Sequence, residues 1–193
     1  VPVIQTLEAR HMPGEIALLP IVESGYNPAA KSYAGASGMW QFMPGTADHM
    51  ELTRDWWYDG RNDPIASTDA ALNYLQSLNN RYDGNWLLAL AAYNVGYGHL
   101  TDARKITELT GGNPDLWMDV KESLPLLSQK RYYRYTRHGF ARGQEPVDYV
   151  QNIRRYYDVL VWNEEQHQHH AFPDDHEAMQ LSSAMITVIP PLL

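Results

Sequence analysis

The chain has 193 residues, of which 44% are hydrophobic, so it can bury the core of one compact domain, or of a domain with an appendage. It contains no cysteine, which excludes disulfides, thiolate metal ligands and a cysteine nucleophile. Its formal net charge of -8 argues against broad binding to nucleic acid, because that binding relies on Lys and Arg to neutralise phosphates.

Helical periodicity is found almost throughout the chain, and no sustained alternation of Val, Ile and Thr marks strands, so we expect a mainly α fold. Asp63-Pro64 is typical of a helix start, and Asp83-Gly84 predicts the end of that helix. The apolar residues that recur at helical spacing between them are Ile65, Ala71, Leu72, Leu75 and Leu78. Asn85 predicts the cap of the next helix, 86–94, which is apolar on nearly all sides and should lie in the core.

Two further helices are expected in the second half of the chain. One should cover 99–109 and end at Gly111-Gly112, and a long one should follow Glu145-Pro146. The inner stripe expected for the long helix is Val147, Val150, Ile153, Tyr157 and Leu160. His, Gln, Asp and Pro then become frequent, so we expect a domain over 1–162 and a polar, loosely packed tail over 163–193.

Glu23 is the most informative single residue, because it ends the apolar run 18–22. Burial makes a carboxyl hard to ionise, and such a group can donate a proton near neutral pH. Without context, a half-buried glutamate on a helix is more often a salt-bridged structural group. The segment 35–44 supplies context, since it combines backbone-permissive glycines with large flat or soft side chains and one amide, which suits the wall of a sugar cleft.

Several short motifs follow Glu23 in order and at fixed spacing. They are Glu23-Ser24, Ser32, Gly35-Ala36-x-Gly38-Met39-x-Gln41-x-Met43-Pro44 and Ala91-Ala92-Tyr93-Asn94-x-Gly96. Together they resemble the catalytic domain of the lytic murein transglycosylases, and the resemblance covers residues 1–162. In detail, 12–94 resembles the membrane-bound transglycosylase D branch and 102–154 resembles the F branch. A natural mixed lineage and a recombined or designed chain would both produce such a join.

The resemblance implies a lysozyme-like helical fold of the goose type, with a groove that binds the glycan strands of peptidoglycan. Glu23 matches the family's glutamate at the end of a helix, which protonates the bond between N-acetylmuramic acid and N-acetylglucosamine and then takes a proton from the attacking C6 hydroxyl. The product is a 1,6-anhydromuramic end, with no cofactor. The alternatives are a goose-type lysozyme-like hydrolase of the same bond and a non-catalytic peptidoglycan-binding domain.

Two-carboxylate glycosidases need a second acid, and the resemblance implies that this chain does not. The acidic residues near the motif are Asp48, Glu51, Asp55, Asp59 and Asp63. None of them lies in a motif that matches a nucleophile.

The resemblance also assigns substrate-binding roles to Ser32, Gln41, Met43, Tyr93, Asn94 and Tyr149. Ser32 would lie near the N-acetyl or C6 region of the sugar, and its alternative role is that of a loop or cap hydroxyl. Gln41 would be a groove amide, whereas a Met stripe such as the one that includes Met43 is more often core. Tyr93 and Asn94 would line the site, or equally form a packed helix C-terminus.

Two other clusters carry chemistry of their own. A basic stretch, Lys130, Arg131, Arg134, Arg137 and Arg142, is interleaved with Tyr132, Tyr133, Tyr135 and Phe140. It could meet a phosphate-rich polymer or the carboxylates of peptide stems, or it could be a solvated face, and we expect no nucleic acid partner. The second cluster is His167, His169 and His170 with Glu164, Glu165 and His176. Its spacing matches no metal framework, so we expect no metal site.

The expected location follows from the substrate alone, and it is the periplasm, with outer-membrane association in a longer parent. No run approaches the roughly 20 consecutive apolar residues that span a bilayer, so we expect no transmembrane segment. The chain begins with neither an initiator methionine nor a charged signal segment, which favours a soluble, processed chain. A monomer is favoured.

Overall fold

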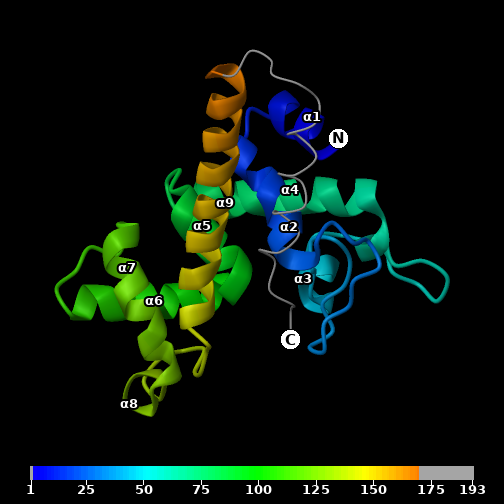
Figure 1. The fold of residues 1–193 in the computed structure, drawn as a ribbon. Helices are drawn as coiled ribbons and strands as arrows, with labels where there is room; N and C mark the ends of the chain where they lie inside the picture. Colours follow the sequence, from blue (N-terminus) through cyan, green and yellow to red (C-terminus); the bar gives the residue numbers. More distant parts are fainter. Residues whose placement is uncertain (1, 170–193) are drawn as a thin grey trace. The chain divides into compact units, whose positions relative to one another are not determined.

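The computed structural model of the chain describes residues 2–169. The elements of its first half are α1 (Pro2–Ala9), the 3₁₀ helix η1 (Gly14–Leu18), α2 (Leu19–Ser24), α3 (Pro44–His49), the 3₁₀ helix η2 (Gly60–Asn62), α4 (Pro64–Arg81) and α5 (Trp86–Val95) (Figure 1). Those of its second half are α6 (Tyr97–Leu109), α7 (Trp117–Ser123), the 3₁₀ helix η3 (Leu124–Ser128), α8 (Lys130–Tyr133) and α9 (Gln144–His169). The mainly α prediction is confirmed.

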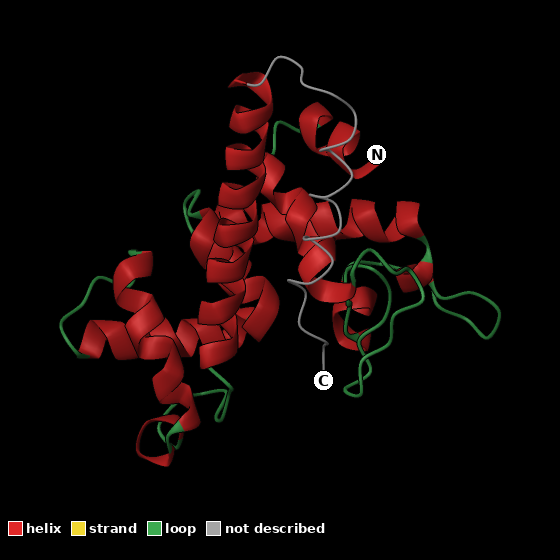
Figure 2. Cartoon of the chain, in the orientation of Figure 1, coloured by secondary structure: helices red, strands yellow, loops and turns green. Residues whose placement is uncertain are grey.

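Long loops separate α2 from α3 and α3 from α4 (Figure 2). Within the described residues, extended pairing is limited to three isolated bridges, all in these loops: Lys31 with Ser37, Ser37 with Phe42, and Arg54 with Asp59. The loops therefore depend for their shape on side-chain contacts more than on a backbone ladder.

The core is built around α5, a helix that carries apolar residues on nearly all of its faces. Helix α4 packs against α5, α5 against α6, and α6 against α7. The leucines that are almost completely buried are Leu7, Leu19, Leu72, Leu75, Leu78, Leu88, Leu100, Leu124 and Leu127. Burying one such side chain stabilises a fold by roughly 1.5–3 kcal/mol, so this cluster holds the helices in fixed positions around the loops.

The predicted helix starts at Asp63 and Asn85 are confirmed by their capping hydrogen bonds. The Asp63 carboxylate accepts from the backbone N–H groups of Ile65 and Ala66, at 2.8 and 3.0 Å. The Asn85 amide oxygen accepts from the N–H groups of the second and third residues of α5, at 3.1 and 3.2 Å. Helix α6 begins at Tyr97, two residues earlier than expected, because α5 and α6 are joined by Gly96 alone.

Three residues of the predicted inner stripes are exposed. Ile65 is 74% exposed, because it lies in the first turn of α4, ahead of the residues that meet the core. Tyr157 and Leu160 are 37% and 49% exposed, so the buried stripe of α9 ends at Ile153. Helical periodicity continues along a helix whether or not another element covers it, which is why the pattern overestimated both stripes.

Residues 163–169 of the expected tail continue α9, and 170–193 lie outside the described residues. The described residues up to Tyr157 form one unit, which contains all the residues assigned to the site. Residues 158–169 belong to a separate unit. In the described part of the chain, no helix combines the length and the apolar character needed to cross a membrane.

Candidate active site

Glu23 lies one residue before the end of α2, and the neighbouring residues explain why the helix ends there. Pro20 stands at the helix start, where its fixed φ is favourable. Gly25 adopts the left-handed conformation, with φ of 61°, and closes the helix. The Ser24 hydroxyl donates to the carbonyl oxygen of Met39 at 2.9 Å, which ties the helix end to the following loop. Glu23 is therefore held on an anchored, rigid segment.

Burial raises the pKa of Glu23 from its ordinary value of 4.5 to about 7. Tyr149 opposes this effect, since its hydroxyl donates to Oε1 of Glu23 at 2.8 Å and stabilises the charged form. Burial is the larger cause, so the carboxyl holds its proton in a substantial fraction of molecules at neutral pH. The contact joins α2 to α9 across 126 positions of the chain.

Two tyrosines have pKa values raised well above the usual 10, first by burial and then by the negative charge of Glu23. They are Tyr93 and Tyr149, and both stay protonated as hydrogen-bond donors. The Tyr93 hydroxyl donates to the carbonyl oxygen of Trp40 at 2.8 Å. Trp40 itself is completely buried and donates from its indole nitrogen to Thr68, so it is an anchor of the loop and does not stack on a ligand.

A pocket of about 100 Å³ opens beside Glu23. The residues that line it are Glu23, Gln41, Phe42, Met43, Thr46, Tyr74, Tyr93 and Asn94. Four of the six predicted substrate-binding residues are thus brought to the glutamate, and Tyr149 joins them through its hydrogen bond.

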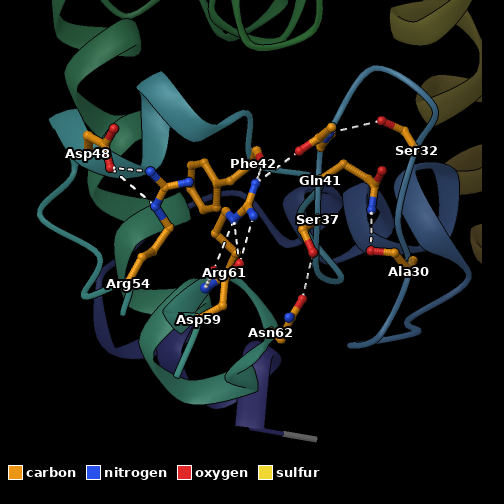
Figure 3. Close-up of polar contacts among 12 residues, drawn as sticks. Ala30, Ser32, Ser37, Gln41, Phe42, Asp48, Arg54, Asp59, Arg61 and Asn62 are labelled. Carbon is orange, nitrogen blue, oxygen red and sulfur yellow. Dashed lines mark hydrogen bonds and ion pairs between the residues drawn. The ribbon is translucent and has the colours of Figure 1, made fainter. Parts of the chain in front are cut away.

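Gln41 has a left-handed backbone, with φ of 49°, and its side chain turns back onto its own loop. The amide nitrogen donates to the carbonyl oxygen of Ala30 at 3.3 Å (Figure 3). It also donates to the carbonyl oxygen of Gly38 at 2.7 Å. The amide N–H₂ group therefore holds the loop, which leaves the side-chain oxygen as the atom that can accept from a ligand. Met43 is 44% exposed at the pocket, as a wall residue would be.

Ser32 does not line the Glu23 pocket. Its hydroxyl oxygen accepts from the backbone N–H of Ala36 at 3.0 Å, and its own N–H donates to the carbonyl oxygen of Ala36 at 2.9 Å (Figure 3). In this structure Ser32 closes a loop turn, which is the alternative that the sequence left open.

Phe42, Thr46 and Tyr74 line the pocket and were not singled out from the sequence. Tyr74 packs against Tyr93, with ring centroids 5.8 Å apart, and Phe42 does so at 6.4 Å. Tyr74 lies on α4, beside the apolar stripe that pattern analysis assigned to the core. The Tyr74 hydroxyl, a polar group on an otherwise apolar helix face, is the sequence feature that could have indicated a pocket residue.

Arg61 holds the loop that carries Gln41 (Figure 3). It pairs with Asp59, Nη2 to Oδ2 at 2.6 Å, and its Nη1 donates to the carbonyl oxygens of Gly35 and Phe42, at 2.9 and 3.2 Å. The pair is mostly buried, so its geometry is fixed. A Cβ atom at Gly38 would lie 1.7 Å from the carbonyl oxygen of Arg61, so only glycine permits this approach.

The Glu23 pocket adjoins two larger hollows. The first, of about 480 Å³, shares Thr46 and Tyr74 with the Glu23 pocket. The second, of about 700 Å³, shares Arg81, Tyr97 and His138 with the first. The three depressions therefore follow one another from α2 past α4 to α6 and α8, as a binding site for an extended ligand requires.

No group of three or more metal-ligating side chains is found in the described part of the chain. The side chains of His167, His169 and His170 lie outside the described residues.

A family model described as "Transglycosylase SLT domain" matches residues 4–114, which include Glu23 and the whole pocket around it. Among curated proteins, the membrane-bound lytic murein transglycosylase F of Alteromonas mediterranea is 48% identical over 158 residues, covering 78% of this chain and 33% of that protein. The protein of the same name from Saccharophagus degradans is 44% identical over 160 residues, covering 79% of this chain and 30% of that protein. The chain spans about a third of the length of these relatives.

The names of these relatives confirm the resemblance to the F branch. A match of 158 residues within 193 must extend into the front half as well. The finer resemblance of the front half to the D branch stays a prediction.

Two solved structures are similar to the chain in fold. The lytic transglycosylase Slt of Pseudomonas aeruginosa, solved as an inactive mutant, aligns with a TM-score of 0.54 at 20% identity, over 81% of this chain and 24% of that one. The 70-kDa soluble lytic transglycosylase of Escherichia coli aligns with a TM-score of 0.53 at 24% identity, over 81% and 24%. At such identities the likeness concerns the fold alone, and it confirms the lysozyme-like helical prediction.

Proposed function

The chain belongs to the transglycosylase SLT domain family, and on that premise we propose that it cleaves the β-1,4 bond between N-acetylmuramic acid and N-acetylglucosamine in peptidoglycan by transglycosylation. The observation that carries the proposal is the state of Glu23, a half-buried carboxyl whose pKa is raised to about 7 at the edge of a pocket. A group with this pKa is protonated often enough at neutral pH to act as a general acid. The relatives are named lytic murein transglycosylases, which supports the same substrate.

The proposed reaction uses Glu23 twice. Its proton passes to the glycosidic oxygen as the bond from that oxygen to C1 of the muramic residue breaks. The C6 hydroxyl of the same sugar then attacks C1, and its proton returns to the Glu23 carboxylate. The product carries a 1,6-anhydromuramic end, no water is consumed, and the enzyme is restored to its starting protonation state.

Tyr149 supports this cycle by its position on Oε1. Because its hydroxyl donates to that oxygen, the acidic proton is favoured on the other carboxyl oxygen, Oε2. The same hydrogen bond strengthens when Glu23 becomes charged after it has donated its proton. Tyr149 thus stabilises the carboxylate during the interval between the two proton transfers.

The surroundings of Glu23 favour a mechanism with one carboxylate. Among the described residues that line the pocket, Glu23 is the sole acid. Three of the acids nearest in sequence are used elsewhere: Asp48 pairs with Arg54, Asp59 pairs with Arg61, and Asp63 caps α4. Glycosidases that use a second carboxylate hold it roughly 5–10 Å from the first.

The three adjoining hollows are proposed to hold the glycan strand, with the scissile bond at Glu23. Because murein lies in the periplasm of bacteria with an outer membrane, we propose that compartment as the place of action. The chain is expected to require no metal or organic cofactor for this reaction.

Replacing Glu23 with Gln tests the proposal, because Gln keeps the shape of the side chain and removes the acid. We expect lysis of purified murein to fall by at least about a thousandfold, while sedimentation with murein is retained. Glu51→Gln is the matched control, since Glu51 is exposed and lies outside the pocket, and it should lyse murein normally. Unchanged lysis by the Glu23 variant would show that this residue takes no part in the mechanism. If the products of the unaltered protein have reducing ends and are heavier by one water than the anhydro products, the protein is a hydrolase.

A further inference from the structure

The hollow between α6 and α8 concentrates positive charge in an acidic chain, and we call it the cationic hollow. Its four cationic lining residues are Arg81, Lys105, Arg131 and Arg137. The whole chain has 15 Lys and Arg against 23 Asp and Glu. Four of those 15 cations at one depression give it a local charge opposite to that of the molecule, which points to an anionic ligand.

The arginines of the cationic hollow are not neutralised by nearby acids. In residues 2–169, no carboxylate is within ion-pair distance of Arg81, Arg131 or Arg137, whereas Lys105 pairs with Glu108 at 2.7 Å. These three exposed guanidinium groups therefore have their charge available to a ligand.

The buried carboxylate of Asp102 holds the loop that carries Arg137 through hydrogen bonds to its backbone. Asp102 is 6% exposed and accepts from the backbone N–H groups of Arg137 and His138, at 3.2 and 2.8 Å. Its charge is used inside the fold. The His138 ring packs closely on the backbone of Gly98, where a Cβ atom would lie 2.7 Å away. The cationic hollow is thus a built depression with an ordered floor.

Aromatic rings supply the remaining walls. Arg81 lies over the Tyr97 ring, with Cζ 5.1 Å from its centroid, and Arg131 lies over the Tyr132 ring at 4.9 Å. Stacking orients the planar guanidinium groups, and since Nε of Arg131 donates to Oε1 of Gln129 at 3.0 Å, the two terminal nitrogens of Arg131 are left to donate to a ligand. A ligand that fits such walls combines carboxylates, which arginine binds in a bidentate manner, with carbon chains that contact the rings.

We propose that the cationic hollow binds the acidic peptide stems of peptidoglycan, through bidentate contacts from Arg131 and Arg137 to stem carboxylates. The inference rests on the proposed function, because the hollow adjoins the Glu23 pocket through the depression that contains Tyr74. A glycan strand that lies along the three hollows carries a peptide on each muramic residue. The carboxylates of these peptides are the anions that such a strand would bring to the cationic hollow. The net charge of -8 disfavours a long polyanion as the ligand.

The first test compares murein glycan strands that keep their stems with strands from which an amidase has removed them. We expect Arg137→Ala and, separately, Arg131→Ala to raise KM for stem-bearing strands about tenfold, with little change in kcat. KM for stem-free strands should not change. Arg142→Ala is the matched control, because Arg142 belongs to the same basic stretch, is exposed, and does not line the hollow. It should leave both substrates unaffected.

The second test measures binding without catalysis, by NMR titration of the Glu23→Gln chain with the free stem tripeptide alanyl-γ-glutamyl-diaminopimelate. We expect saturable shifts that weaken about tenfold when Arg137→Ala is added and that weaken with added salt. Inorganic polyphosphate is the competing probe, and we expect it to bind more weakly than the tripeptide.

The outcomes separate the two claims. Equal rises in KM on stem-bearing and stem-free strands would overturn the stem assignment in favour of sugar binding. Absence of tripeptide binding, or tighter binding of polyphosphate, would also overturn it while leaving murein cleavage in place. If the tripeptide binds at Arg137 and the chain cleaves neither strand, the stem site stands and the proposed function fails.

Discussion

Replacing Glu23 with Gln should stabilise the protein above neutral pH, and the size of the gain follows from the pKa. Burial raises this pKa from 4.5 to about 7, so the folded protein keeps a proton that the unfolded chain releases between those values. The contribution of the protonated carboxyl is fully present below pH 4.5 and is lost as pH rises to about 7. At about 1.4 kcal/mol per pH unit, the loss totals about 3 kcal/mol, reduced by the water that reaches the half-buried group.

The Gln variant should lack this loss, because its amide is neutral at every pH and its oxygen can still accept from Tyr149. Its free energy of unfolding should match that of the unaltered protein at about pH 4.5 and exceed it by up to about 3 kcal/mol at about pH 8. Urea unfolding followed by circular dichroism gives both values at each pH. Other titrating groups are common to the two proteins, so they cancel in the difference.

Glu51→Gln is again the control, and it should show no such dependence on pH, since Glu51 is exposed. A difference between the Glu23 variant and the unaltered protein that stays constant from acid to alkaline pH would refute the reasoning. It would mean that the carboxyl is solvated in the fold and is not held protonated by burial.

Three further predictions concern residues around Glu23. Tyr149→Phe removes the hydrogen bond that lowers the pKa of Glu23, so the alkaline decline in murein cleavage should move to higher pH while kcat at the optimum falls, as a pH-rate profile will show. Gly38→Ala should unfold or strongly destabilise the chain in thermal melts, whereas Gly35→Ala, with a similar φ but open space, should cost about 1–2 kcal/mol. Arg61→Lys loses the forked contacts to the loop and should raise KM for murein several-fold without changing the pKa read from the pH profile, and a shifted pKa would contradict a purely positioning role.

Local signals in the sequence were sufficient for two of the helix starts. Asp63 and Asn85 cap the helices that they were expected to start, because a cap depends on the side chain and the next three residues. The place of Glu23 at the end of an apolar run was visible in the sequence, but its burial depends on segments that lie far away in the chain. Ile65 lies on the expected apolar stripe but is exposed, because burial depends on what covers the helix.

Contacts between distant segments could not be obtained from the sequence pattern. Tyr149 was assigned to the groove by resemblance, but its bond to Glu23 spans 126 positions. Tertiary packing likewise determines the hydrogen bond from Arg61 to the Phe42 carbonyl and the position of Tyr74 in the pocket. For Ser32 the resemblance predicted a place at the site, whereas in the structure its hydroxyl closes a local turn and does not line the pocket.

Digestion of murein in oxygen-18 water, followed by mass spectrometry of the released fragments, tests the central claim most directly. If the C6 hydroxyl attacks C1 and gives its proton to Glu23, the fragments will be lighter by one water than hydrolysis products and will contain no oxygen-18. Fragments with reducing ends that carry one oxygen-18 atom would contradict the account, because water would then be the nucleophile.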